Sequence, residues 1–167
     1  MARLHVAPLR HIADVVRATG ARDLVSLINV GTPIERPAAI TRHLLIGVSD
    51  VAEPREGHVA PGRTHVAALL AFVRGWDRAA PLLIHCWAGV SRSTAAAFIT
   101  ACALDPARAE CAIAAQLRAA SPTATPNPRL VAVADAMLGR QGRMGAAVAQ
   151  IGRGTACFEG APFALDI

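Results

Sequence analysis

Short apolar runs alternate with amphipathic stretches along the chain, and this pattern predicts an α/β fold. Apolar runs of strand length lie at residues 4–7, 23–29, 43–48 and 82–84. The first is typical of a short edge strand and the other three of buried strands. Because helical stretches separate these runs, we expect a three-layer sandwich with a small, mainly parallel central sheet flanked by helices.

Helical periodicity is clearest in the stretch before the last of these strands. Val66, Leu69, Leu70, Val73 and Trp76 recur at the spacing of one helical face. Further helices are predicted at residues 9–19, 93–104, 107–119 and 128–138, and a short one near 144–151. A polar stretch at 49–62 predicts an unusually long loop, and such loops are often functional.

Length and composition limit the class of protein. The 167 residues fit one domain, and 53% hydrophobic against 17% charged residues exclude intrinsic disorder. The longest apolar stretch, 95–104, has about half of the ~20 residues that a membrane-spanning helix needs. Arg3, His5 and Arg10 interrupt the N-terminus, so no signal peptide is expected. We therefore expect a soluble cytoplasmic protein with no membrane partner.

The charge balance suggests anionic partners only weakly. Seventeen basic residues, all arginine, stand against twelve acidic ones, which gives a net charge of +5. Arginine binds phosphate well, but the alanine- and arginine-rich composition is also what a GC-rich genome favours, and it suggests a bacterial protein. The arginines are scattered, and with 4% aromatic residues and no tyrosine the chain offers few stacking platforms. No nucleic-acid partner is expected.

The four cysteines and two of the histidines give no sign of a disulfide framework or a metal site. No CxxC pair occurs, so free thiols are expected. Cys102 and Cys111 fall in predicted helices and are interpreted as core residues. His58 and His65 lack cysteine or carboxylate companions, so we predict no metal and no cofactor.

The segment with the most chemical information is 82–94, LLIHCWAGVSRST. An apolar strand ends at His85 and Cys86, a loop passes through Gly89, and Arg92 opens a helix. Loop amides that converge on a helix N-terminus form an anion site, and a guanidinium adds a matching fork of donors. A cysteine in such positive surroundings is activated as a thiolate. The segment therefore predicts phosphoryl transfer through a covalent cysteine intermediate.

This segment resembles the signature of the cysteine-dependent protein tyrosine phosphatases. His85-Cys86, five residues and Arg92-Ser93, in the form Cys-x-Ala-Gly-x-Ser-Arg-Ser, are most similar to the compact dual-specificity branch. A rhodanese-like sulfurtransferase fits the pattern poorly. The resemblance covers about residues 24–138 of a single domain spanning 1–167, and it leaves 139–167 as a C-terminal extension.

The resemblance implies a role for each residue of the motif. Cys86 would be the nucleophile, Arg92 would bind the phosphate, and Ser93 would assist departure of the thiolate. His85 would orient the loop, and Gly89 would let the backbone wrap around the phosphate oxygens. Main-chain amides for the phosphate would come from the loop residues Trp87, Ala88, Gly89, Val90 and Ser91.

The resemblance also implies a general acid and a supporting residue outside the motif. Asp50 follows a predicted strand and opens the long loop, 36 positions before Cys86 (86 − 50), and we predict that it is the acid. Glu53 and Glu56 in the same loop remain alternatives. Asn127, after Pro126, would hydrogen-bond the phosphate loop, and it also suits a helix N-cap.

The expected substrate is a phosphorylated protein or a small phosphomonoester, with phosphate, sulfate or vanadate as site ligands. Phosphotyrosine is favoured, and a shallow pocket would also accept phosphoserine and phosphothreonine. The stretch between Cys86 and Arg92 has no basic residue, which argues against inositol lipids. The alternative is a catalytically silent phosphate-binding module, which would be expected to lack at least one of the catalytic residues.

Overall fold

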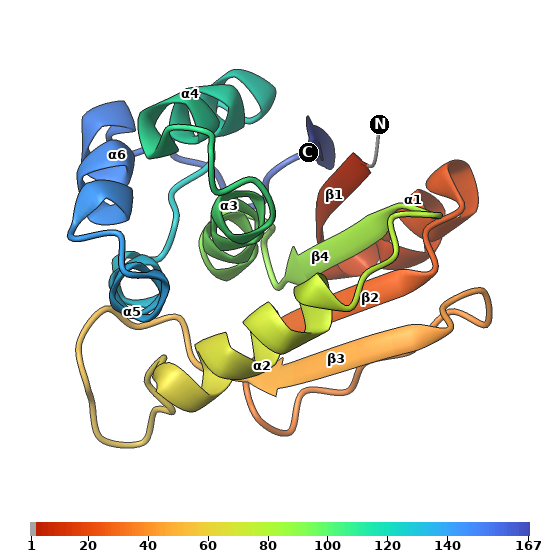
Figure 1. Cartoon of the computed structure of the whole chain (residues 1–167). Helices are drawn as coiled ribbons and strands as arrows, with labels where there is room; N and C mark the ends of the chain where they lie inside the picture. Colours follow the sequence, from red (N-terminus) through yellow and green to blue (C-terminus); the bar gives the residue numbers. More distant parts are fainter. Residues whose placement is uncertain (1–2) are drawn as a thin grey trace.

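The computed structural model describes residues 3–167 and consists of a five-stranded sheet with helices on both faces (Figure 1). The strand order is β3-β2-β4-β1-β5. The strands are β1 (Arg3–Pro8), β2 (Asp23–Ile28), β3 (Arg42–Gly47), β4 (Leu82–Cys86) and β5 (Phe163–Asp166). Strands β1 to β4 run parallel to one another, and β5 runs antiparallel to β1. The predicted sandwich with a mainly parallel sheet is confirmed.

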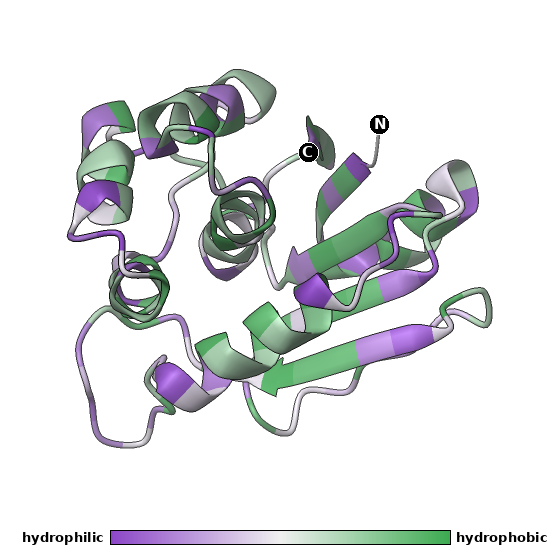
Figure 2. Ribbon diagram, viewed as in Figure 1, coloured by the Kyte–Doolittle hydropathy of each residue, from purple (hydrophilic) through white to green (hydrophobic). Residues whose placement is uncertain are grey.

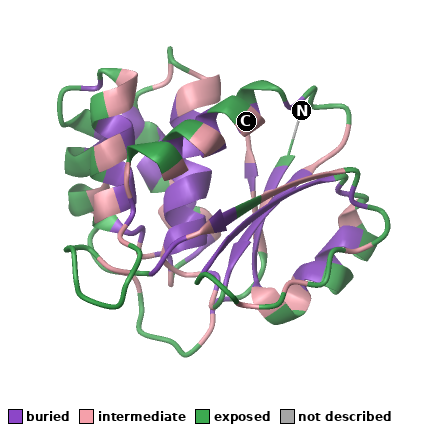
Figure 3. Ribbon diagram, turned by 90° about the horizontal axis from the view of Figure 1, so that it is seen from below, coloured by how far each residue is buried: buried purple, intermediate pink, exposed green. Residues whose placement is uncertain are grey.

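One helix covers one face of the sheet, and five lie on the other. The helices are α1 (Ile12–Thr19), α2 (Arg63–Arg74), α3 (Arg92–Leu104), α4 (Glu110–Ala120), α5 (Pro128–Leu138) and α6 (Arg143–Ile151). Helix α1 packs on Leu24 and Leu83. Val25 and Ile84, one position further along the same strands, face the larger core with α2 and α3. Figure 3 shows the buried strands between the two helical layers.

Helix α3 lies at the centre of the larger layer. It packs directly on β1, β2 and β4, and α2, α4 and α5 surround it. This position explains its alanine-rich, apolar sequence, because residues on every side of the helix are buried. None of the helices in residues 3–167 combines the length and the hydrophobicity needed to cross a membrane.

Several predicted elements differ in detail from those in the structure. Strand β1 is not an edge strand, because β5 pairs with it. Strand β3 is the edge instead of a buried strand, and its Leu45 is 55% exposed. In Figure 2, β3 is hydrophilic at its start and hydrophobic only toward its end. Cys111 is exposed on α4, so its assignment to the core was wrong, whereas Cys102 is buried.

Three helix boundaries also shift. Residues Leu9–His11 form a 3-10 turn ahead of α1. Helix α4 starts three residues later than predicted, because a turn in which Arg108 donates to the Asp105 carbonyl precedes it. Trp76 lies beyond the end of α2, where it is buried and its indole N–H donates to the Ala80 carbonyl at 2.8 Å.

The segment after Gly139 belongs to the same core. Gly139 ends α5 in the left-handed conformation, and the Asp135 carboxylate accepts hydrogen bonds from the backbone N–H groups of Gly142 and Met144. These contacts fold α6 back against α4 and α5. The chain then continues to β5, where Leu165 is buried in the larger core.

Candidate active site

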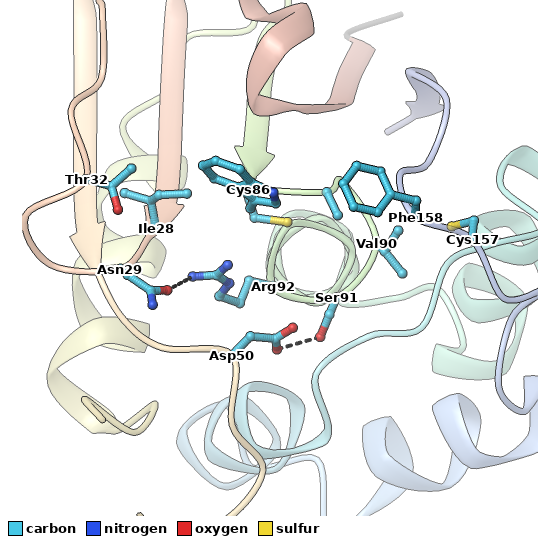
Figure 4. Close-up of a pocket in the computed structure, with 12 residues that line it drawn as sticks. Ile28, Asn29, Thr32, Asp50, Cys86, Val90, Ser91, Arg92, Cys157 and Phe158 are labelled. Atoms are coloured by element: carbon cyan, nitrogen blue, oxygen red, sulfur yellow. Dashed lines mark hydrogen bonds between the residues drawn. The ribbon is translucent and has the colours of Figure 1, made fainter. Parts of the chain in front are cut away.

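The predicted nucleophile lies at the carboxyl end of β4, where a cavity of about 490 Å³ opens. Its lining includes Cys86, Arg92 and Asp50, together with Trp87, Ala88, Val90 and Ser91 of the intervening loop. The remaining walls come from Ile28, Asn29, Thr32, Cys157 and Phe158. Figure 4 shows Thr32 and Phe158 on opposite sides of Cys86. The carboxyl ends of parallel strands are where ligands bind in open α/β sheets.

The loop between Cys86 and Arg92 is held from outside by its carbonyl groups. Those of Trp87, Ala88 and Val90 accept backbone hydrogen bonds from Leu9, Gly160 and Thr125, in that order. In a trans peptide the N–H points opposite to the carbonyl. The N–H groups that follow these carbonyls are therefore turned inward. Among residues 3–167, the backbone N–H groups of 87–91 find no backbone acceptor, which is the arrangement of an anion-binding nest.

Gly89 makes the tight course of this loop possible. Its φ of +69° lies in the left-handed region, and a Cβ at this position would approach the Pro8 backbone nitrogen to 2.8 Å. Any larger residue would therefore strain the loop and push it off β1. The contact that demands a glycine here is with Pro8 of β1, and wrapping of the loop around phosphate oxygens stays a prediction.

The Arg92 side chain is fixed by the ends of two neighbouring strands. One terminal nitrogen, Nη1, donates to Asn29 Oδ1 at 2.7 Å and to the Val48 carbonyl at 2.8 Å. The side chain is buried, and Nε has no hydrogen-bond partner within residues 3–167. A buried donor without an acceptor is costly, and an oxygen of a bound phosphoryl group would satisfy it. Sequence reasoning missed Asn29, although a polar residue at the end of an apolar strand was a usable signal.

Ser93 is in position to stabilise a thiolate. Its Oγ lies 3.1 Å from Cys86 Sγ, and both side chains are buried. When the sulfur is ionised it can only accept, so the hydroxyl must be the donor. A hydrogen bond of this kind stabilises the negative charge that the sulfur carries after it loses a proton or releases a bound group.

Asp50 lies beside the loop, held there by two hydrogen bonds. Its Oδ1 accepts from Ser91 Oγ at 2.7 Å and from Asn127 Nδ2 at 2.8 Å. The first of these bonds is drawn in Figure 4. Oδ2 has no such partner in the described part of the chain, so it is the oxygen free to exchange a proton. Glu53 borders a neighbouring hollow that Asp50 also lines and that does not include Cys86, and Glu56 is exposed in the loop.

Within residues 3–167, Asn127 bonds the loop between Cys86 and Arg92 through its backbone and not through its side chain. Its backbone N–H donates to the Ser91 carbonyl at 3.2 Å, while Nδ2 reaches Asp50 and the Val51 carbonyl. The side-chain oxygen caps α5 by accepting from the N–H groups of Arg129 and Leu130. The side chain therefore links α5 to the loop that carries Asp50.

His85 belongs to a row of polar side chains that crosses three strands. His85 Nδ1 contacts the Cys86 carbonyl at 3.1 Å, and Nε2 lies 2.6 Å from Ser26 Oγ. Ser26 Oγ is in turn 2.8 Å from His43 Nε2. A carbonyl only accepts, so Nδ1 of His85 carries the proton and Nε2 accepts from Ser26. Ser26 then accepts from His43, and each hydrogen bond orients the next.

Burial keeps His85 neutral. Desolvation lowers its pKa to about 4, although the hydrogen bond to the Cys86 carbonyl opposes this shift. The pKa of His43 is also lowered, first by burial and then by Arg36. The two rings are therefore uncharged at neutral pH, and the tautomers assigned above are the ones that support the loop.

Stability should fall in acid because of this row. In the unfolded chain His85 takes up a proton near pH 6.5, and in the folded protein only near pH 4. The unfolded state therefore binds more protons between these values, and about 3 kcal/mol of unfolding free energy is lost as pH falls from 6.5 to 4. Urea unfolding at pH 7, 5.5 and 4.5 should show a smaller fall in His85→Asn than in the wild type.

The exposed His58 provides the control for this measurement. His58→Asn should reproduce the wild-type dependence on pH, because that ring is not buried. If the free energy of unfolding fell with pH equally in the wild type and His85→Asn, His85 would not be the group responsible for the loss of stability in acid.

Two further predictions concern the region near the long loop: the role of His65 and the question of a metal site. His65 Nδ1 accepts from the Gly62 N–H at 3.0 Å and so helps to start α2. Within residues 3–167, no three His, Cys, Asp or Glu side chains come close enough to hold a metal ion.

Comparison with solved structures identifies proteins that share this fold, whereas two comparisons of other kinds find no match. No protein-family model matches the chain. No curated protein matches it either. Similar solved structures include DUSP15, which is 18% identical, with a TM-score of 0.64 over 90% of this chain and 91% of that one.

Two further structures illustrate the range of proteins with this fold. The human tyrosine phosphatase-like serine/threonine/tyrosine-interacting protein is 14% identical, with a TM-score of 0.66 over 83% of this chain and 92% of that one. A mouse putative dual specificity phosphatase complexed with zinc tungstate is 20% identical, with a TM-score of 0.59 over 86% of each chain. The chain therefore has the fold of the dual-specificity and tyrosine phosphatases.

Proposed function

We propose that this protein is a cysteine-dependent protein phosphatase that hydrolyses phosphotyrosine through a cysteinyl-phosphate intermediate. The observation that carries the proposal is the position of Cys86 beneath inward-turned loop amides, next to the fixed guanidinium of Arg92. An anion cradle and a nucleophile coincide at this point. The segment after Gly139 is included in the same catalytic domain, because it supplies core residues and part of the cavity wall.

In the first step, the Cys86 thiolate attacks phosphorus and the bond between phosphorus and the ester oxygen breaks. Asp50 gives the proton from Oδ2 to the departing oxygen, and the phosphoryl group remains on sulfur. The amides of the loop and the guanidinium stabilise the charge on the equatorial oxygens. All these groups belong to the chain, so no cofactor is invoked.

In the second step, water attacks the phosphocysteine and Asp50 takes its proton. The bond between phosphorus and sulfur breaks, inorganic phosphate leaves, and the hydroxyl of Ser93 stabilises the returning thiolate through the 3.1 Å contact. The same carboxylate thus serves as acid and then as base. Oδ1 keeps its two hydrogen bonds throughout, which fixes the carboxylate while Oδ2 exchanges the proton.

The proposal is tested by the initial rate of hydrolysis of a small aryl phosphate in the presence of a strong chelator. Turnover that vanadate inhibits competitively would support it, because vanadate occupies the same oxyanion site. Loss of turnover on chelation would point to a metal-dependent reaction instead. A protein that binds vanadate but hydrolyses nothing would be the silent binding module.

The Asp50→Asn variant tests the acid within the same assay. Turnover should fall about 10²-fold on phenyl phosphate, whose leaving group needs a proton, and much less on an ester of an acidic nitrophenol. Substrate affinity should change little. Glu53→Gln is the matched control and should behave as the wild type; a leaving-group-dependent loss in that variant would move the acid to Glu53.

A further inference from the structure

Two exposed aromatic side chains stand at the mouth of the candidate active site. The chain has four phenylalanines and two tryptophans. Phe158 is 92% exposed and Trp87 is 56% exposed, and both line the cavity that contains Cys86. Exposure of large aromatic groups is unfavourable in water, so their gathering at one opening indicates a binding role.

Phe158 is held at this position by the backbone on either side of it. The Gly160 N–H donates to the Ala88 carbonyl at 2.9 Å, and the Thr155 N–H donates to the Pro122 carbonyl at 2.9 Å. Arg10 also forms a 2.6 Å ion pair with Glu159. The ring is therefore presented from a fixed segment, and Figure 4 shows it facing the cavity from the side of the C-terminal tail.

The two aromatic residues also border a second hollow. This hollow has a volume of about 250 Å³ and is lined by Leu9, Arg10, Trp87, Phe158 and Glu159. Trp87 and Phe158 thus line both the cavity that contains Cys86 and the smaller hollow. When a phosphate is bound at Cys86, a planar group attached to that phosphate would lie beside an aromatic surface.

The charges around the cavity favour a substrate with one phosphate and an uncharged remainder. Arg92 is the only basic residue in the lining, and Asp50 is the only acidic one. The basic and acidic residues of the second hollow, Arg10 and Glu159, neutralise each other. A second phosphate group would find no free cation in either set of lining residues.

We propose that Trp87 and Phe158 form an aryl-binding site that makes the protein selective for aryl phosphates over alkyl phosphates. The proposal rests on the proposed phosphatase function and names the substrate class of that site. Aromatic rings pack edge-to-face or offset-stacked with a favourable energy beyond that of their buried area. Phosphotyrosine presents such a ring directly on the phosphate oxygen, whereas phosphoserine and phosphothreonine do not.

Binding of two phosphonates tests the proposal without any need for turnover. The Kd values of phenylphosphonate and methylphosphonate are measured for the wild type and Phe158→Ala. We expect Phe158→Ala to weaken phenylphosphonate about 10-fold and methylphosphonate less than 2-fold. Phe158→Tyr should restore phenylphosphonate binding, because it restores the ring. Leu45→Ala, at an exposed apolar position on β3, is the control and should change neither value.

Kinetics on two aryl substrates distinguish a site for the ring from a site for a peptide. If the site binds the aromatic ring of the substrate, Phe158→Ala raises KM about equally for phenyl phosphate and for a phosphotyrosine peptide. A rise for the peptide alone would overturn the proposal in favour of contacts to flanking residues. Equal weakening of both phosphonates, or no change in either, would also overturn it. A wild type that bound phenylphosphonate selectively but had no turnover would contradict the phosphatase function and leave the aryl site standing.

Discussion

Cys86→Ser should lose at least about 10⁴-fold in turnover of an aryl phosphate while it still binds vanadate or phosphate. The serine hydroxyl is a weak nucleophile without a base to activate it. The hydroxyl of Ser93, which lies 3.1 Å from the sulfur in the wild type, cannot act as that base. The inward-turned amides and Arg92 are unchanged in this variant. The variant should therefore keep its affinity for vanadate and lose turnover, as expected when only the nucleophile is removed.

The measurement is the initial rate beside the dissociation constant for vanadate, both at neutral pH. Cys111→Ser is the matched control, because Cys111 is an exposed thiol on α4 and should keep the wild-type rate. The wild type should also form a phosphoenzyme that can be trapped in acid, and Cys86→Ser should not. Equal rates in wild type and Cys86→Ser would show that the chemistry does not pass through this sulfur.

Arg92→Lys should lower turnover about 10³-fold even though the charge is kept. One terminal nitrogen of the guanidinium is already committed to Asn29 and the Val48 carbonyl, which leaves Nη2 and Nε for the phosphoryl group. A lysine ammonium has a single nitrogen. It cannot satisfy the two strand-end acceptors and present a planar pair of donors to the phosphoryl oxygens at the same time.

Because Arg92 is buried, its replacement also needs a measure of folding. Urea unfolding of Arg92→Lys should show that the protein remains folded at the assay temperature, so that the lost rate reflects the site. Arg74→Lys, at an exposed position at the end of α2, is the control and should leave rate and stability unchanged. Near-normal turnover in folded Arg92→Lys would contradict the role assigned to the guanidinium fork.

The region from 82 to 94 could be understood from the sequence because its structure is local. A strand, a tight loop and a helix N-terminus follow each other directly, so Cys86, Gly89 and Arg92 are brought together by backbone geometry over a few residues. Helix α5 was predicted with correct bounds for a related reason, since Asn127 caps its start and Gly139 ends it. Local hydrogen bonding and hydrophobic periodicity carry this information.

The sequence alone predicted Asp50 as the acid, with Glu53 and Glu56 as alternatives. These three carboxylates share one loop, and no local rule indicates which of them lines the cavity that contains Cys86. The contacts of Asp50 with Ser91 and Asn127 come from residues 41 and 77 positions away. Whether those contacts form depends on how the loop after β3 is placed against α3 and α5.

The final segment gave the weakest signal. Strand β5 has only four residues, and its pairing with β1 joins positions more than 150 residues apart, such as Arg3 and Asp166. Phe158 precedes it in a glycine-bearing stretch with no periodicity. Nothing in the neighbouring residues indicates that this segment returns to the loop after Cys86, where Gly160 bonds Ala88.

The amino-acid pattern was enough to predict the alternation of strands and helices, the mainly parallel sheet and a candidate reactive segment from Cys86 to Arg92. The edge strand, the residues that fix Arg92 and the two aromatic residues at the cavity could be identified only from contacts between distant parts of the chain. The physical reason is the range of the interactions. Periodicity and capping act within a few residues, whereas Asn29, the row from His43 to His85, and Phe158 reach the site through strand register and chain topology.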